Sequence, residues 1–167
     1  KIKGEKKAIT TVNDLRGNDP SKHKTNIPTY EVVTLGEVYE GIELKLKAYG
    51  NNVEKLFYVK PGADPGVIKM KLGGAKALRV NEKGQLEAET ALGIVNFTKP
   101  IVYQEIEGKR VELEAEYVIR DREPLSVQGD KNIDTDNGHE QRIVYGFKLG
   151  DYDRTQGIVI DPLLVFG

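Results

Sequence analysis

The chain has 167 residues, of which 38% are hydrophobic and 31% charged, and 25 basic against 26 acidic side chains leave a net charge of −1. A nearly neutral chain has no strong overall field, which argues against nucleic acid or an anionic membrane surface as its partner. No apolar run approaches the length of a membrane span, so no membrane insertion is expected. The absence of cysteine excludes disulfides, zinc–thiolate sites and thiol catalysis. The length suits a single domain, and the unusual ends, Lys1 and an apolar final run, lead us to expect a fragment of a longer polypeptide.

The N-terminal segment is polar and predicts an extended lead-in, a partial N-terminal arm, over residues 1–24. One short strand is expected near Ala8 to Val12. The run Asp19-Pro20-Ser21-Lys22 is typical of a single helical turn, because aspartate caps a helix and proline suits its first position. A single β-sandwich domain is then expected over residues 25–167, beginning with a strand at Thr29 to Leu35.

The clearest local unit is a hairpin between Gly36 and Pro65. Apolar and charged residues alternate from Ile42 to Ala48, which is the period of a strand with one buried face. Residues 50–52 (Gly-Asn-Asn) tolerate the positive φ of a tight turn, and a second strand returns over Val53 to Lys60. The prolines after it end the strand, since proline cannot donate a ladder hydrogen bond.

Later segments repeat the same kind of pattern. Strands are expected at Gly66–Leu72, Ala77–Asn81, Gln85–Thr90, Gly93–Thr98, Ile101–Ile106, Val111–Ile119, Ile143–Leu149 and Gly157–Asp161. A long polar loop is expected from Asp121 to Glu140. Turn signals separate the strands at roughly 8–12-residue intervals, which predicts an all-β fold, an antiparallel β-sandwich of two sheets with little or no helix.

Six short motifs in a fixed order carry a family resemblance. They are Gly17–Lys22 (GNDPSK), Thr25–Tyr30 (TNIPTY), Val38–Leu44 (VYEGIEL), Val59–Pro65 (VKPGADP), Lys99–Gln104 (KPIVYQ) and Ile158–Pro162 (IVIDP). Together they resemble the uncharacterised all-β domain found N-terminal to SBBP-type β-propeller repeats in large secreted bacterial proteins. The resemblance implies an extracellular or cell-surface location and downstream β-propeller repeats of the same chain as a partner. It carries over no catalytic residue.

One polar run within the expected loop has alternating oxygen-bearing side chains. Asp130, Asn132, Asp134 and Asp136 are candidate metal ligands, because carboxylates at every second position can converge on one calcium ion. Neither register of this run has the glycine and glutamate that an EF-hand loop requires, so such a site would be irregular. A solvated loop without a bound ion is the competing interpretation.

Other residue types give weaker signals for catalysis. His23 and His139 lie far apart in sequence and have no metal-binding spacing. The glutamates at 105, 112, 114 and 116 are predicted on outward strand faces, where solvation explains them. Asp161 follows an apolar strand, and a structural role in hydrogen bonding is expected for it.

Tyrosine is the dominant aromatic residue, with eight copies against four phenylalanines and no tryptophan. Exposed tyrosines can stack on sugar rings. However, Tyr58, Tyr117 and Tyr145 fall within predicted strands, where packing across strands is the commoner use.

Three functions remain open from the sequence. The first is a non-enzymatic structural or interaction module that flanks β-propeller repeats and could form a homodimer by edge-strand pairing. The alternative is a carbohydrate-binding module of a polysaccharide-processing protein, assisted by calcium as its one candidate cofactor. The third is a hydrolase that uses two acidic residues in one concave pocket.

Overall fold

A computed structural model describes residues 2–49, 52–123, 142–162 and 164–165. In this part of the chain almost every element is a strand, and two three-residue 3-10 helices, η1 and η2, are the only helical segments. The strands are β1 (Lys3–Asp14), β2 (Lys24–Tyr39), β3 (Ile42–Tyr49), β4 (Asn52–Val59), β5 (Met70–Leu72), β6 (Ala75–Val80), β7 (Leu86–Thr90), β8 (Gly93–Phe97), β9 (Ile101–Ile106), β10 (Lys109–Leu113), β11 (Ala115–Glu123), β12 (Arg142–Leu149), β13 (Ile158–Asp161) and β14 (Leu164–Val165). The helices are η1 (Pro20–Lys22) and η2 (Pro65–Val67).

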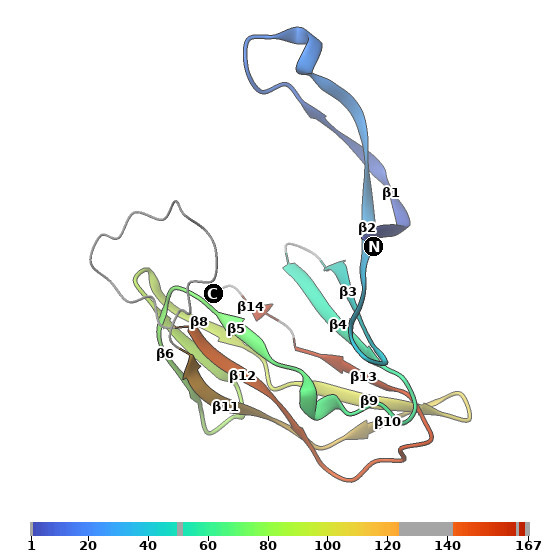
Figure 1. The fold of residues 1–167 in the computed structure, drawn as a ribbon, viewed down its shortest axis with the longest axis vertical. Coiled ribbons are helices and arrows are strands. Elements are labelled where there is room, and N and C mark those ends of the chain that lie inside the picture. The colour runs from blue at the N-terminus through green and yellow to red at the C-terminus, as the bar shows by residue number, and fades with distance from the viewer. Residues whose placement is uncertain (1, 50–51, 124–141, 163, 166–167) are drawn as a thin grey trace.

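All of the described strand pairs are antiparallel, and they form an all-β sandwich as the sequence predicts. One layer is a seven-stranded sheet with the order β1-β2-β3-β4-β13-β9-β10. The strands opposite it form a three-stranded ladder, β11-β12-β5, and a four-stranded ladder, β14-β8-β7-β6. β13 lies between β4 and β9, so two segments that are distant in sequence become neighbours of the same central strand (Figure 1).

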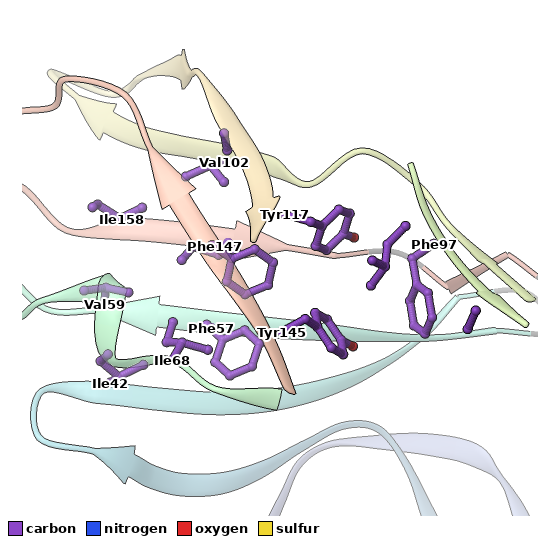
Figure 2. Packing of buried hydrophobic residues seen from close by; sticks show 14 of the residues in the cluster. Ile42, Phe57, Val59, Ile68, Phe97, Val102, Tyr117, Tyr145, Phe147 and Ile158 are labelled. Atoms are coloured by element: carbon purple, nitrogen blue, oxygen red, sulfur yellow. The ribbon is translucent and has the colours of Figure 1, made fainter. Parts of the chain in front are cut away.

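Aromatic side chains fill the space between these layers. Phe147 of β12 lies 6.1 Å from Phe57 of β4 and 5.7 Å from Tyr117 of β11, measured between ring centroids. Figure 2 shows these rings together with Tyr145 and the aliphatic side chains around them. The cluster contains residues of the seven-stranded sheet and of both ladders opposite it, so its burial holds the sandwich together.

The predicted hairpin between Gly36 and Pro65 is confirmed. β3 and β4 pair in continuous register from the Ile42–Val59 pair to the Tyr49–Asn52 pair. Ile42 is fully buried, whereas Val53 is half exposed, so only the base of the hairpin packs into the core. The alternating pattern therefore predicts the strand correctly but overstates how far its buried face extends.

Three boundaries differ from the sequence prediction. The single strand predicted over Val111 to Ile119 is wrong, because the chain breaks at Glu114 and changes its ladder partner from β9 to β12. The expected strand from Gly66 begins instead as η2, which Asp64 caps by accepting a hydrogen bond from the backbone N–H of Gly66 at 2.8 Å. β11 continues to Glu123, so the loop predicted from Asp121 starts later.

The N-terminal segment forms a long ribbon. β1 is longer than the predicted strand near Ala8 to Val12, and it pairs with the 16-residue strand β2. The helical turn predicted after Asp19 is confirmed as η1, and the Asp19 carboxylate accepts a hydrogen bond from the N–H of Ser21 at 3.0 Å. We call β1, η1 and the first half of β2 (residues 2–31) the arm. It extends away from the sandwich (Figure 1).

Candidate functional site

The arm exposes apolar side chains that do not contact the core. Ile2, Val12 and Leu15 are more than half exposed, and Ile9 is fully exposed. A two-stranded ribbon buries little apolar surface of its own and is only marginally stable in water. Exposed aliphatic side chains grouped on such a ribbon mark a surface that gains stability when a partner covers it.

The arm also differs from the rest of the chain in charge. Residues 1–24 carry seven basic and three acidic side chains, whereas residues 25–167 carry 18 basic and 23 acidic ones. β1 is an edge of the seven-stranded sheet, but its pairing with β2 is interrupted by several register shifts. Bulges and lysines are the devices that protect an exposed edge against unwanted strand addition. The arm therefore offers side chains for contact more readily than a regular backbone edge.

A second candidate surface lies on the outer face of the seven-stranded sheet. Val159 of β13 is directly opposite Tyr58 of β4 on one side and Tyr103 of β9 on the other. The residues that flank Val159 in the strand, Ile158 and Ile160, are buried in the core. Because successive side chains of a strand point to opposite faces, the row Tyr58–Val159–Tyr103 points away from the core.

This row borders a hollow of about 330 Å³, which we call the tyrosine hollow. One side of the hollow is lined by Tyr58 of β4 and by Lys60, which follows β4 directly. The other side is lined by Tyr103 and Glu105 of β9. Its floor is formed by residues 157–159 (Gly-Ile-Val), where the side chains are small or point inward. The hollow exists because large residues of two strands flank small residues of the strand between them.

The two tyrosine rings of this hollow are held by cations. The guanidinium carbon of Arg110 lies 3.8 Å from the ring centroid of Tyr103, and the Lys45 ammonium lies 5.2 Å from that of Tyr58. Burial raises the pKa of the Tyr58 phenol, and its neighbour Tyr103 adds to the increase. Cation–π contacts of this kind fix ring orientation and leave the rings pre-arranged for a ligand.

A larger groove of about 800 Å³ lies beside the β6–β7 turn and the start of β11. Its charged lining comes from Glu82, Lys83, Lys99, Glu114, Glu116 and Lys148. The Glu116 carboxylate already pairs with the Lys148 ammonium at 2.9 Å, and the stem of Lys99 lies across Gly84. All three glutamates are exposed, whereas a general acid normally has its pKa raised by burial.

Asp161 occupies the outer face next to the tyrosine row, at the end of β13. Its Oδ1 atom is buried and has no hydrogen-bond partner among the described residues. Burial raises the pKa of this carboxyl, repulsion from Glu54 adds to the increase, and Lys47 and Arg110 oppose it. The hydrogen bonds expected for this carboxyl are therefore not found at Oδ1 among the described residues, and the attraction of the two cations does not offset the effect of burial on its pKa.

The remaining sequence candidates do not converge. The calcium candidates Asp130, Asn132, Asp134 and Asp136 lie outside the described residues, as does His139. His23 lies on the arm, where its Nε2 atom is 3.0 Å from the Gly17 carbonyl oxygen. Among the residues that the structure describes, no three His, Asp or Glu side chains are placed to hold a metal ion.

Two of the tyrosines singled out in the sequence have core positions. Tyr117 and Tyr145 are buried, and the Tyr117 hydroxyl donates a hydrogen bond to the Thr98 carbonyl oxygen at 2.8 Å. Tyr103 was not singled out from the sequence, because its closeness to Tyr58 depends on the insertion of β13 between their strands. Over the described ranges, no helix has the length and apolar character needed to cross a bilayer.

Comparison with known proteins identifies the domain but adds no relative of known activity. No curated protein and no solved structure matches the chain. The family described as "Domain of unknown function (DUF7948)" matches residues 1–163, which is nearly the whole chain. The chain therefore belongs to the DUF7948 family of uncharacterised domains.

Proposed function

We propose that this domain is a non-enzymatic structural and interaction module of a secreted or cell-surface bacterial protein, in which it flanks β-propeller repeats. The arm supports this proposal, because it extends away from the sandwich (Figure 1) and its apolar side chains are exposed in the described part of the chain. The six ordered motifs that resemble the domain preceding SBBP repeats support the proposed neighbourhood and location.

The proposed contact is made by the exposed apolar side chains of the arm. Ile9, Val12 and Leu15 supply the apolar centre, and the surrounding lysines supply solubility when the arm is free. An apolar centre with a polar rim is the usual anatomy of a protein interface. The partner is the neighbouring repeat region of the same polypeptide, and a second copy of the domain is the competing partner.

Hydrogen–deuterium exchange tests this proposal. The amides of β1 are expected to exchange more slowly in a longer parent chain that carries the following repeats than in the 167-residue chain. The substitutions Ile9→Ser and Leu15→Ser should abolish that difference. Leu92→Ser is the matched control, because Leu92 is as exposed as Ile9 but lies on the β7–β8 turn, away from the arm.

Two outcomes would count against the proposal. If the amides of β1 exchange at the same rate in both chains, the arm makes no stable contact with the repeats. Protection that rises with the concentration of the 167-residue chain alone would assign the arm to self-association instead. The reading frame on both sides of the chain separately tests the neighbourhood, since it either encodes a signal peptide and propeller repeats or does not.

A further inference from the structure

We infer that the tyrosine hollow is a binding site for a neutral saccharide. This inference goes beyond the proposed interaction module, because it concerns a different face of the molecule and a different kind of ligand. It also gives the carbohydrate-binding alternative a definite location that does not involve the candidate calcium loop.

The geometry excludes binding by strand addition at this place. β13, the floor of the hollow, is hydrogen-bonded to β4 on one side and to β9 on the other. Its backbone groups are therefore engaged and cannot pair with an extended peptide. A ligand in the hollow must be recognised by side chains.

The two tyrosines give the hollow its aromatic walls. They belong to strands that are two ladder spacings apart, which places their backbones roughly 10 Å from each other. Both side chains line the hollow and are half-buried, so part of each tyrosine stays accessible to a ligand. The face of an aromatic ring is electron-rich, and the C–H groups on the face of a sugar ring carry the complementary partial charge.

The polar groups at the end of the hollow suit hydroxyl groups and do not select for charge. Lys60 can donate hydrogen bonds and Glu105 can accept them, so the lining offers one cationic donor and one anionic acceptor. The Lys60 ammonium is also held by Glu37 at 2.7 Å, which orients it. A ligand with a polar edge and a flat apolar face satisfies this lining better than an anion, a cation or a wholly apolar molecule.

The size of the hollow limits how much of a glycan it can hold. Its volume of about 330 Å³ is at the lower end of the range for small-molecule sites. It therefore suits one or two sugar rings of a longer chain that continues across the open sheet face. Beside the hollow, this face also carries charged side chains in ion pairs, such as Lys45 with Glu5 at 2.9 Å, and the aliphatic side chains of Leu56 and Ile101.

A glycan array followed by calorimetric titration tests the inference. The array should identify a neutral oligosaccharide, and cellohexaose, chitohexaose and maltohexaose are suitable purified probes for titration. Tyr58→Ala or Tyr103→Ala should weaken the binding at least about tenfold. Val159→Phe should have a similar effect by filling the floor between the two rings. Tyr30→Ala is the matched control, since Tyr30 is a partly exposed tyrosine of the arm.

Circular dichroism of each variant separates loss of binding from loss of folding. Val159→Phe keeps both tyrosines, so it remains informative if a Tyr→Ala variant unfolds. Binding should persist in EDTA, because the hollow contains only one carboxylate. The inference is overturned if no glycan binds, if binding survives all three substitutions, or if a chelator abolishes binding that the substitutions do not affect. These readouts are independent of amide exchange in the arm.

Discussion

Gln104 shows how one buried polar side chain secures a surface segment. The side chain is almost completely buried, and its amide nitrogen donates to the carbonyl oxygens of Asp153 at 2.7 Å and Gln156 at 3.3 Å. Its amide oxygen accepts from the N–H of Asp153 at 3.1 Å. One glutamine of β9 thus satisfies three backbone groups of the segment that leads into β13, the floor of the tyrosine hollow.

Replacing this glutamine should destabilise the protein measurably. Gln104→Leu keeps the volume but leaves three backbone groups without their partners, and we expect the free energy of unfolding to fall by about 2–4 kcal/mol. Urea denaturation followed by circular dichroism measures the change. Gln156→Leu is the control, because only the backbone of Gln156 takes part in these bonds. Equal stability of wild type and Gln104→Leu would show that water replaces the lost contacts.

The buried tyrosines predict a loss of stability in alkaline solution. Burial raises the pKa of the Tyr145 phenol to about 12. The unfolded chain releases this proton near pH 10, so the stabilisation is complete below pH 10 and is lost as the pH rises toward 12. The expected slope for this group is about 1.4 kcal/mol per pH unit.

Comparison with Tyr145→Phe isolates this effect from the titration of lysines. Urea midpoints at pH 8, 10 and 11 should fall less steeply for the variant than for the wild type. Tyr117 has its pKa raised in the same direction by burial, so the variant retains part of the dependence. Parallel pH profiles for the two proteins would mean that Tyr145 ionises as readily in the folded state as in the unfolded state.

At the scale of elements, the arm depends on a close contact between a glycine and an aromatic ring. A Cβ atom at Gly4 of β1 would come within 2.4 Å of the Tyr30 ring on β2. The Tyr30 ring thus lies against the backbone of Gly4, in space that the side chain of any other residue at position 4 would need. An aromatic ring that covers a glycine in this way stabilises the pairing of the two strands. Since the arm lies outside the core, disruption of this contact should remain local.

Gly4→Ala should therefore loosen the arm without unfolding the sandwich. We expect amide exchange over β1 to accelerate several-fold while the urea midpoint stays unchanged, because exchange reports the stability of local units. The double variant Gly4→Ala/Tyr30→Thr should recover part of the protection. Gly73→Ala is the control, as a Cβ there meets nothing. A large fall in the urea midpoint of Gly4→Ala would show that arm and sandwich unfold together.

The sequence predicts the elements whose alternation reports a buried face. β3 and β12 are examples, since Ile42 and Leu44 of β3 and Tyr145, Phe147 and Leu149 of β12 lie on the core at every second position. The break between β10 and β11 is invisible in the sequence, because Leu113, Ala115 and Tyr117 all pack on the core on either side of it. The sequence also does not predict the full length of β1. Both faces of the ribbon are exposed to solvent, so its strands need no alternation of apolar and polar residues.

The tyrosine hollow could not be predicted for a different reason. Tyr58, Tyr103 and Val159 are far apart in sequence, and only the order of strands in the sheet makes them neighbours. A sequence pattern predicts to which face of the sheet a residue points, but it does not predict which strand pairs with the strand that carries this residue. Tertiary pairing therefore creates the candidate site from residues that look ordinary one strand at a time.

For the whole molecule, stability rests on side chains that join the layers of the sandwich. Phe147 is such a residue, because it contacts Phe57 of the seven-stranded sheet and Tyr117 of the three-stranded ladder. It is 1% exposed, so truncation leaves a cavity that its neighbours cannot fill without moving. The truncation removes packing between the layers, whereas the backbone hydrogen bonds within each sheet are unchanged.

Phe147→Ala should therefore lower the free energy of unfolding by about 3–5 kcal/mol, a large share of the roughly 5–15 kcal/mol typical of domains. Phe147→Leu should cost less, since most of the volume remains. Val111→Ala, at a partly exposed position of the edge strand β10, should change stability by less than about 0.5 kcal/mol. Urea denaturation should show one transition for each variant, because every ladder contributes to the same core. Two separate transitions in Phe147→Ala would instead mean that the seven-stranded sheet can persist after the opposite layer has unfolded.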